Sequence, residues 1–249
     1  MDRDDPGTLD PSPTVTAPLA PPVAPDQRGI ATLAIGFVIA LVSLLLFAFV
    51  ADRIYSQEAF TLDALANPFL HAIASPGLDL VMTGITNLGS VPVVAAVFAV
   101  TELVLLSHGY RARALFLAVA IGGSVALNSL LKVVVRRPRT ALPWAHVLPD
   151  YSFPSGHTMD TVAFYLAVAL IVWVTFGRRM GLIAIAIALL LSVAVGFSRI
   201  YLGYHYLTDV VGGFAAGLGW LLIVALAFET GPRTWARRPW YRRASGHQT

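Results

Sequence analysis

Six long apolar stretches, separated by short polar segments, constrain this chain more than any other feature. They cover residues 29–51, 79–106, 114–135, 158–176, 181–197 and 208–228. Each is close to the ~20 residues that an α-helix needs to cross the hydrocarbon of a bilayer. The chain is 57% hydrophobic and 12% charged, whereas soluble domains have about 45–50% apolar and roughly 25% charged residues. The sequence therefore predicts an all-α, polytopic membrane helix bundle with about six transmembrane helices.

The remaining segments divide the chain into three parts. Residues 1–28 contain seven prolines and several aspartates, and such a composition cannot bury enough apolar surface to offset the entropy of ordering. We therefore expect a disordered tail there, a membrane domain over 29–230 and a basic tail over 231–249. A longer loop over 52–78 follows the first apolar stretch, and we expect short interfacial helices around 60–73.

The distribution of lysine and arginine predicts an orientation. In the six-helix arrangement, one side of the membrane carries eleven of these residues and the other six. The cytoplasmic side of membrane proteins carries the excess, so both termini are expected in the cytoplasm. Five of the six residues on the extracytoplasmic side lie in segment 132–139 or at Arg199. A cluster of cations on this side indicates a function that uses them.

Lys132 is the only lysine of the chain and lies near the end of a predicted transmembrane helix. One interpretation is a snorkelling lysine whose amine reaches the membrane interface. Because Arg137 and Arg139 follow closely, an anion-binding site is the alternative. For Arg136 and Arg137 themselves, a solvated position at the interface is favoured over binding of a second phosphate or of the loop.

The tetrapeptide Pro154-Ser155-Gly156-His157 directly precedes an apolar stretch. A proline, a small residue and a glycine allow a tight turn into a helix, whose first amides have no helical partner and attract anions. An ordinary helix start with a surface histidine has the same pattern. Asp160 follows in this helix, where it is expected to complement the helix N-terminus.

The third cluster is Ser198-Arg199, followed by His205 and Asp209. His205 and Asp209 are four residues apart and therefore share one helix face. The aspartate can hold the proton of one imidazole nitrogen and leave the other nitrogen free to attack. A histidine at a helix start, paired with a capping acid, is the structural alternative.

Topology brings the three clusters to one membrane face, since the six-helix arrangement places segments 132–139, 154–157 and 198–209 on the same side of the membrane. Together they supply cations, backbone amides, two histidines and a carboxylate, which are the groups needed to transfer a phosphoryl group through a covalent histidine intermediate. The chain has no cysteine, which excludes thiolate chemistry. No basic block interleaved with aromatic residues indicates nucleic-acid binding.

The three clusters resemble the signature of the type-2 phosphatidic acid phosphatase family, which also includes haloperoxidases. That signature has a lysine and an arginine seven apart, then Pro-Ser-Gly-His, then Ser-Arg with a histidine six residues after the arginine and an aspartate four further on. Thr140 departs from it, because the family usually has proline after the first arginine. The motifs cover residues 132–209, and the helix layout extends the resemblance over about 29–230.

The resemblance implies a role for each motif residue. His205 would be the nucleophile, Asp209 would orient it, and His157 would protonate the leaving group and then activate water. The phosphoryl oxygens would be bound by Lys132, Arg139, Ser155, Gly156 and Arg199. No cofactor or metal is implied, and the surrounding cations disfavour zinc.

The expected function is hydrolysis of a lipid phosphate or lipid diphosphate at the extracytoplasmic face, without a metal. Candidate substrates are a polyprenyl diphosphate, phosphatidate and phosphatidylglycerol phosphate. The alternatives are a phosphotransferase of the same family and an anion transporter or channel, which would have basic residues at several depths. A vanadate-dependent haloperoxidase fits an embedded chain least. The sequence leaves the particular lipid and the oligomeric state open.

Overall fold

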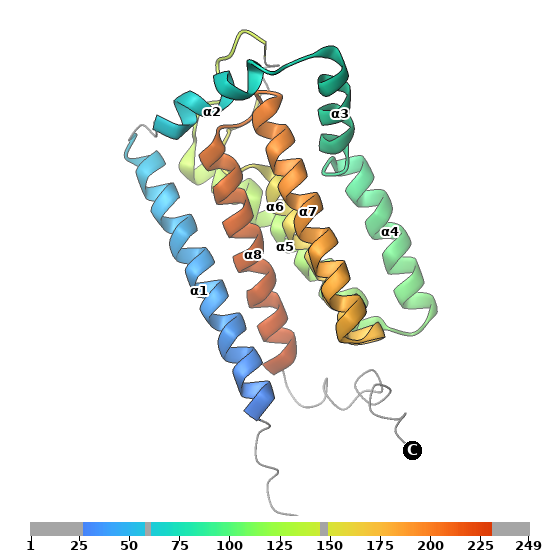
Figure 1. Cartoon of the computed structure of the whole chain (residues 1–249). Helices are drawn as coiled ribbons and strands as arrows, with labels where there is room; N and C mark the ends of the chain where they lie inside the picture. Colours follow the sequence, from blue (N-terminus) through green and yellow to red (C-terminus); the bar gives the residue numbers. More distant parts are fainter. Residues whose placement is uncertain (1–26, 58–60, 145–148, 231–249) are drawn as a thin grey trace, which may run out of the picture.

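The computed structural model describes residues 27–57, 61–144 and 149–230, and the regular structure in these residues is helical (Figure 1). The helices are α1 (Gln27–Tyr55), α2 (Thr61–His71), α3 (Pro76–Asn87), α4 (Val91–Ser107), α5 (Arg111–Val135), α6 (Gly156–Phe176), α7 (Arg178–Tyr201) and α8 (Leu207–Thr230). The predicted tails at 1–28 and 231–249 lie outside the described residues, except that α1 already begins at Gln27.

Five of these helices, α1, α5, α6, α7 and α8, are each long and apolar enough to cross a membrane. The pair α3 and α4 passes the same test together, with a bend of 42° between the two helices. If this pair counts as one span, the described residues contain six spans. The predicted all-α membrane bundle is therefore confirmed, and the protein is a multi-pass membrane protein.

The bend falls where the second apolar stretch is interrupted by Gly89 and Pro92. Ser90 caps α4 and Pro92 occupies its first turn, so the helix restarts rather than continues. A Cβ added at Gly89 would lie 2.7 Å from Val195 Cγ1 and 3.0 Å from Thr161 Cγ2. Glycine is therefore required here, because the linker passes directly against α6 and α7.

Helix α6 lies at the centre of the bundle and packs against α5, α7 and α8. Glycines on α8 allow the closest of these contacts. A Cβ added at Gly213 would lie 2.7 Å from the carbonyl oxygen of Ser155, and one at Gly217 would lie 2.5 Å from that of Met159. Helix α8 thus contacts the backbone of the first turns of α6.

Helix α2 buries polar residues and exposes apolar ones, which is the reverse of a surface helix in a soluble protein. Its polar residues Asp63 and Asn67 are 5% and 2% exposed, whereas Leu62, Leu65 and Phe69 are among its exposed side chains. An apolar outer face fits a helix that lies in the membrane interface. Two helices over 61–87 replace most of the predicted loop, and α2 coincides with the expected interfacial helix.

Figure 1 shows that α2 lies across one end of the bundle. At this end α5 and α7 terminate and α6 and α8 begin, while α1 begins and α8 ends at the other end. The segments 132–139, 154–157 and 198–209 therefore converge beneath α2, as the topology argument predicted.

Candidate active site

Lys132 lies in the last turn of α5, and its side chain turns toward the loop that precedes α6. The Nζ atom donates to the carbonyl oxygen of Tyr151 at 2.9 Å and to the carboxylate of Asp150. The side chain is only 14% exposed. Lys132 is therefore a fixed cation with protein partners and not a lysine that merely extends into the interface.

Arg139 connects the first motif to the third. Its Nη1 atom donates to the carbonyl oxygen of Tyr204 at 2.9 Å and lies 3.1 Å from His205 Nε2. The guanidinium also pairs with the Asp150 carboxylate. Thr140, which stands where the resembled family usually has proline, donates to the carbonyl oxygen of Gly203. This hydrogen bond fixes the loop to the third motif, whereas a proline would stiffen the loop through its ring.

Asp150 is the shared acidic partner of Lys132 and Arg139, and sequence reasoning did not identify it. Its side chain is 48% exposed. Burial alone would raise the pKa of Asp150, but hydrogen bonds from Lys132 and Arg139 outweigh it and hold the pKa below its ordinary value. The carboxylate is therefore ionised and accepts a hydrogen bond from each of the two cations.

The second motif begins α6, with Ser155 in the N-cap position. The Ser155 amide donates to the carbonyl oxygen of Asp209 at 3.0 Å. Its hydroxyl accepts from Thr158 Oγ1 at 3.0 Å, which leaves the hydroxyl proton for another acceptor. The motif is thus tied to the start of α8, and in this structure the Ser155 amide has a protein partner.

Gly156 is the first residue of α6, and a Cβ there would lie 3.1 Å from Asn128 Oδ1. The Asn128 amide in turn donates to the carbonyl oxygen of Pro154 at 3.3 Å. Helix α5 thereby fixes the turn that precedes α6 through the Asn128 side chain. His157 follows in the first turn of α6 and is partly exposed.

A tight turn between α7 and α8 carries the third motif. The amides of Tyr204 and His205 donate to the carbonyl oxygen of Arg199 at 3.0 and 3.3 Å. Gly203 has a φ of +75°, in the left-handed region that glycine adopts readily. The turn places His205 inside the protein, with only 2% of the residue exposed.

The His205 ring has one partner on each nitrogen. Nδ1 lies 3.3 Å from Asp209 Oδ2, and Nε2 lies 3.1 Å from Arg139 Nη1. Because a guanidinium only donates, Nε2 is the acceptor and the proton is on Nδ1. Burial lowers the pKa of His205 to about 4, although the hydrogen bond to Asp209 acts in the other direction. The ring is therefore neutral at physiological pH, with its Nε2 lone pair facing the cations.

Arg199 is a buried cation, 5% exposed. Its Nη1 donates to Thr86 Oγ1 at 3.1 Å, and its guanidinium carbon lies 4.1 Å from the centre of the Tyr204 ring. Within the described part of the chain, its Nε has no hydrogen-bond partner. A buried guanidinium with an unused donor favours binding of an anion.

The interpretation of Arg137 as a solvated interface residue is wrong. Its guanidinium pairs with Asp209 Oδ1 at 2.6 Å and Asp63 Oδ2 at 2.7 Å, and it lies 4.0 Å from the centre of the Tyr206 ring. Burial would lower the pKa of Arg137, but the two carboxylates outweigh it and raise the pKa above its ordinary value. Arg136, by contrast, is exposed and caps α5.

Asp160 also differs from its predicted role, because it accepts a hydrogen bond from Ser124 Oγ at 2.7 Å. It therefore links α6 to α5, and it lies beyond the first turn of α6, which contains no acidic residue.

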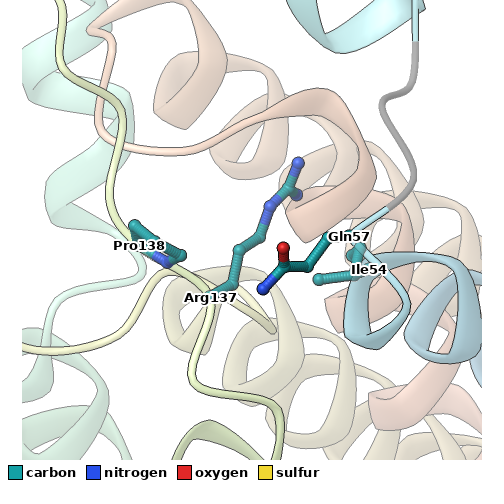
Figure 2. A pocket seen from close by; sticks show the side chains of 4 residues that line it. All are labelled: Ile54, Gln57, Arg137 and Pro138. Carbon is teal, nitrogen blue, oxygen red and sulfur yellow. The ribbon is translucent and has the colours of Figure 1, made fainter.

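A cavity of about 370 Å³ lies beside the segment that follows α5 (Figure 2). It is lined by Ile54 and Gln57 at the end of α1 and by Arg137 and Pro138. The cavity thus borders Arg137, whose guanidinium is paired with the carboxylates of Asp63 and Asp209.

Several residues that contact the motifs were not predicted from the sequence. They are Asp63, Asn67, Thr86, Asp150 and Ser152. One signal for two of them exists in the sequence: Asp63 and Asn67 are four residues apart among apolar neighbours, which places them on one helix face. The others lie in loops or near a helix end and have no local pattern.

Comparison with known proteins finds relatives of this chain. The family model described as the PAP2 superfamily matches residues 113–233. The chain is 35% identical over 182 residues to phosphatidylglycerophosphatase B of Bacillus subtilis. This alignment covers 70% of this chain and 87% of that protein. It is 30% identical over 143 residues to the undecaprenyl-diphosphatase of Sulfolobus acidocaldarius, covering 53% and 64% of the two chains.

The fold is also similar to a solved structure, that of a transmembrane PAP2-type phosphatidylglycerolphosphate phosphatase from Bacillus subtilis. The TM-score is 0.72 at 28% sequence identity, and the match covers 78% of this chain and 98% of the other.

Proposed function

The chain belongs to the PAP2 superfamily, and from this premise we propose that it hydrolyses a lipid phosphate or lipid diphosphate through a phosphohistidine at His205. The observation that carries the proposal is the environment of the His205 ring. Asp209 holds the proton on Nδ1, and Nε2 faces Arg139 at 3.1 Å. A nucleophile and the cations that would bind its target are thus adjacent.

In the first step, His205 Nε2 attacks phosphorus, and a nitrogen–phosphorus bond forms as the bond to the leaving oxygen breaks. His157 gives its proton to that oxygen. The imidazole gains positive charge, which the Asp209 carboxylate stabilises. In the second step, water attacks phosphorus, His157 takes a proton from the water, and the nitrogen–phosphorus bond breaks to release phosphate and neutral His205.

The phosphoryl oxygens would be bound by Lys132, Arg139 and Arg199, together with the Ser155 hydroxyl and the Gly156 amide. Charge that develops on a transferring phosphoryl group is stabilised most by donors that are already in place. Arg199 supports this role because it is buried and its Nε is unused by the described residues. The three cations replace the neutralising function of a metal, so we propose catalysis that persists in a chelator.

The substrate is proposed to be a lipid because the motifs lie at the ends of membrane helices. A headgroup would reach them while its tails remain in the bilayer. Phosphatidylglycerol phosphate, phosphatidate and a polyprenyl diphosphate are the candidates, and the names of the relatives support the first and the last. The site is proposed to face the extracytoplasmic side, with both termini in the cytoplasm.

The test is phosphate release from these three lipids by the purified protein in nanodiscs, with and without a chelator. His205→Ala should lower kcat by at least a thousand-fold, roughly the loss seen on removal of a covalent nucleophile. His108→Ala is the matched control, since His108 is exposed beyond the end of α4. Equal turnover by wild type and His205→Ala would overturn the proposal, and so would release that needs an added metal.

A further inference from the structure

Helix α2 directs its polar residues toward the site and its apolar residues outward. Asp63 and Asn67 are 5% and 2% exposed, whereas Leu62, Leu65 and Phe69 are 59–73% exposed. Burial of an aspartate is unfavourable unless the charge is paired and hydrogen-bonded. The partners of these two residues therefore indicate what the helix does.

Asp63 contacts the beginning of α8, the helix that carries Asp209. Its Oδ1 accepts from the Thr208 amide at 2.9 Å, and its Oδ2 accepts from Thr208 Oγ1 at 2.6 Å. The first amides of a helix have no partner within the helix itself. Asp63 supplies that partner from a helix 145 residues away in sequence, and so fixes the position of α8.

Asn67 contacts the turn that carries His205. Its amide donates to the carbonyl oxygen of Ile200 at 2.8 Å and to that of His205 at 3.2 Å. These two carbonyl groups lie at the start and the end of the turn. One side chain of α2 thus bridges the turn and holds the backbone of His205.

Asp63 also begins a chain of charged groups that ends at His205. Its Oδ2 accepts from Arg137 Nη2 at 2.7 Å, Arg137 Nη1 donates to Asp209 Oδ1 at 2.6 Å, and Asp209 Oδ2 accepts from His205 Nδ1 at 3.3 Å. Asp209 is 0% exposed, and its Oδ2 also accepts from the Ser152 hydroxyl and from the Tyr206 amide at 3.0 Å. Its orientation therefore depends on protein partners, Arg137 among them, and not on water.

The charges along this chain alternate. Arg137 alone would neutralise Asp209 and weaken the stabilisation of a positively charged His205 ring. Asp63 offsets that effect, because it pairs with the same guanidinium. With His205 neutral, the four side chains carry a net charge of −1, and a positively charged ring brings the sum to zero.

We propose that α2 is a positioning helix for the nucleophile: Asp63, acting through Arg137, sets the orientation and charge of Asp209, and Asn67 fixes the backbone of His205. The inference deepens the proposed function, on which it rests. Asp63, Asn67 and Arg137 are positioning residues, since none of them contacts the reacting atoms. A helix that only completes the fold would affect stability alone.

The test compares Asp63→Asn with Asp63→Glu in the full-length protein in nanodiscs. Asp63→Asn keeps a hydrogen-bonding side chain and removes the charge, so kcat should fall by about tenfold or more, as for loss of a buried charged partner. KM should change by less than about threefold, because the phosphate-binding cations are untouched. Asp63→Glu should restore part of kcat. Asp52→Asn removes an exposed acid near the end of α1 and should match wild type.

A double-mutant cycle separates positioning from folding. In an Asp209→Asn background, Asp63→Asn should lower kcat by less than about twofold, since the group through which it acts is already altered. Equal fold-losses in the two backgrounds would overturn the inference. So would an Asp63→Asn protein that has wild-type kcat, or one that loses thermal stability while kcat stays unchanged.

A second readout does not depend on lipid turnover. Diethyl pyrocarbonate acylates neutral imidazole, and mass spectrometry follows its reaction at His205. Asp63→Asn should slow this modification by several-fold relative to Asp52→Asn, about as much as loss of an orienting partner changes nucleophilic reactivity. If wild type releases no phosphate from any lipid but the modification slows, the proposed function fails and the positioning role stands. If the modification rate is unchanged, the positioning role fails by itself.

Discussion

Asp150 competes for the same donors that are proposed to bind phosphate. Lys132 and Arg139 both donate to its carboxylate, whose side chain is 48% exposed. Because the carboxylate is half exposed and reaches water when it leaves the cations, a phosphate that makes more contacts can displace it.

Asp150→Asn is therefore expected to tighten inhibition by inorganic vanadate by about two- to fivefold, because removal of a surface ion pair frees both cations. The inhibition constant of vanadate in the phosphate-release assay measures this, with Asp52→Asn as the charge-matched control. Weaker inhibition in Asp150→Asn alone would mean that Asp150 holds the cations in place and does not compete with the ligand.

The depressed pKa of His205 predicts the pH dependence of catalysis. Burial lowers it to about 4 from an ordinary value of 6.5. A lowered histidine pKa favours the neutral ring, so the nucleophile stays active as pH falls through 6.5 and is lost only as pH falls through about 4. The measurement is kcat/KM against pH, corrected for ionisation of the substrate. An acid limb assigned to His205 and centred at its ordinary pKa would contradict the burial argument.

At the residue scale, the sequence predicted the residues that belong to local motifs and missed those held by distant contacts. Lys132 with Arg139, and His205 with Asp209, stand seven and four residues apart within their motifs, and the structure brings the motif segments together. Asp63 and Arg137 meet only after folding, since 74 residues separate them. Arg137 has no local feature that distinguishes it from Arg136, so its burial could not be predicted.

Helix α8 is positioned against α6 by glycines, and this contact determines the distance between the second and third motifs. Gly213→Ala would place a Cβ 2.7 Å from the Ser155 carbonyl oxygen. Backbone cannot yield as a flexible side chain can, so α8 must move away from α6. Asp209 lies one turn before Gly213, and its carbonyl oxygen accepts from the Ser155 amide at 3.0 Å, so the motifs should separate.

We expect Gly213→Ala to lose at least tenfold in kcat/KM, in line with the sensitivity of catalysis to displacements of about 1 Å. Gly122→Ala is the matched control, because an added Cβ there meets nothing within 4 Å. In a helix interior, that replacement should be neutral or stabilise by up to about 1 kcal/mol. Phosphate-release kinetics and thermal unfolding of both variants test this. Equal activity of the two would show that the close approach of α8 is dispensable.

At the scale of elements, apolar stretches predicted the spanning helices well, because a length of about 20 apolar residues admits few structures in a bilayer. The break between α3 and α4 falls inside the apolar stretch 79–106, around Gly89 and Pro92. Helix α2 was expected as an interfacial helix, but its function could not be predicted. Its importance depends on which face turns inward, and the contacts of Asp63 and Asn67 decide that.

The whole molecule has a polar site at one end of an apolar bundle, and its orientation in the membrane is a prediction. Because the chain contains no cysteine, single cysteines can report it without background. Gln57→Cys, at the site end, should react with an impermeant maleimide in intact cells. His108→Cys, beyond α4 at the other end, should react only after the cells are opened. The reverse pattern would place the site in the cytoplasm.

The central claim is that His205 carries the phosphoryl group. The most direct test mixes the protein with lipid labelled in its phosphate, quenches the reaction within milliseconds and locates the label. The account predicts an acid-labile, base-stable phosphoryl group on the peptide that contains His205. Rapid phosphate release without labelled protein, or label on another residue, would contradict it.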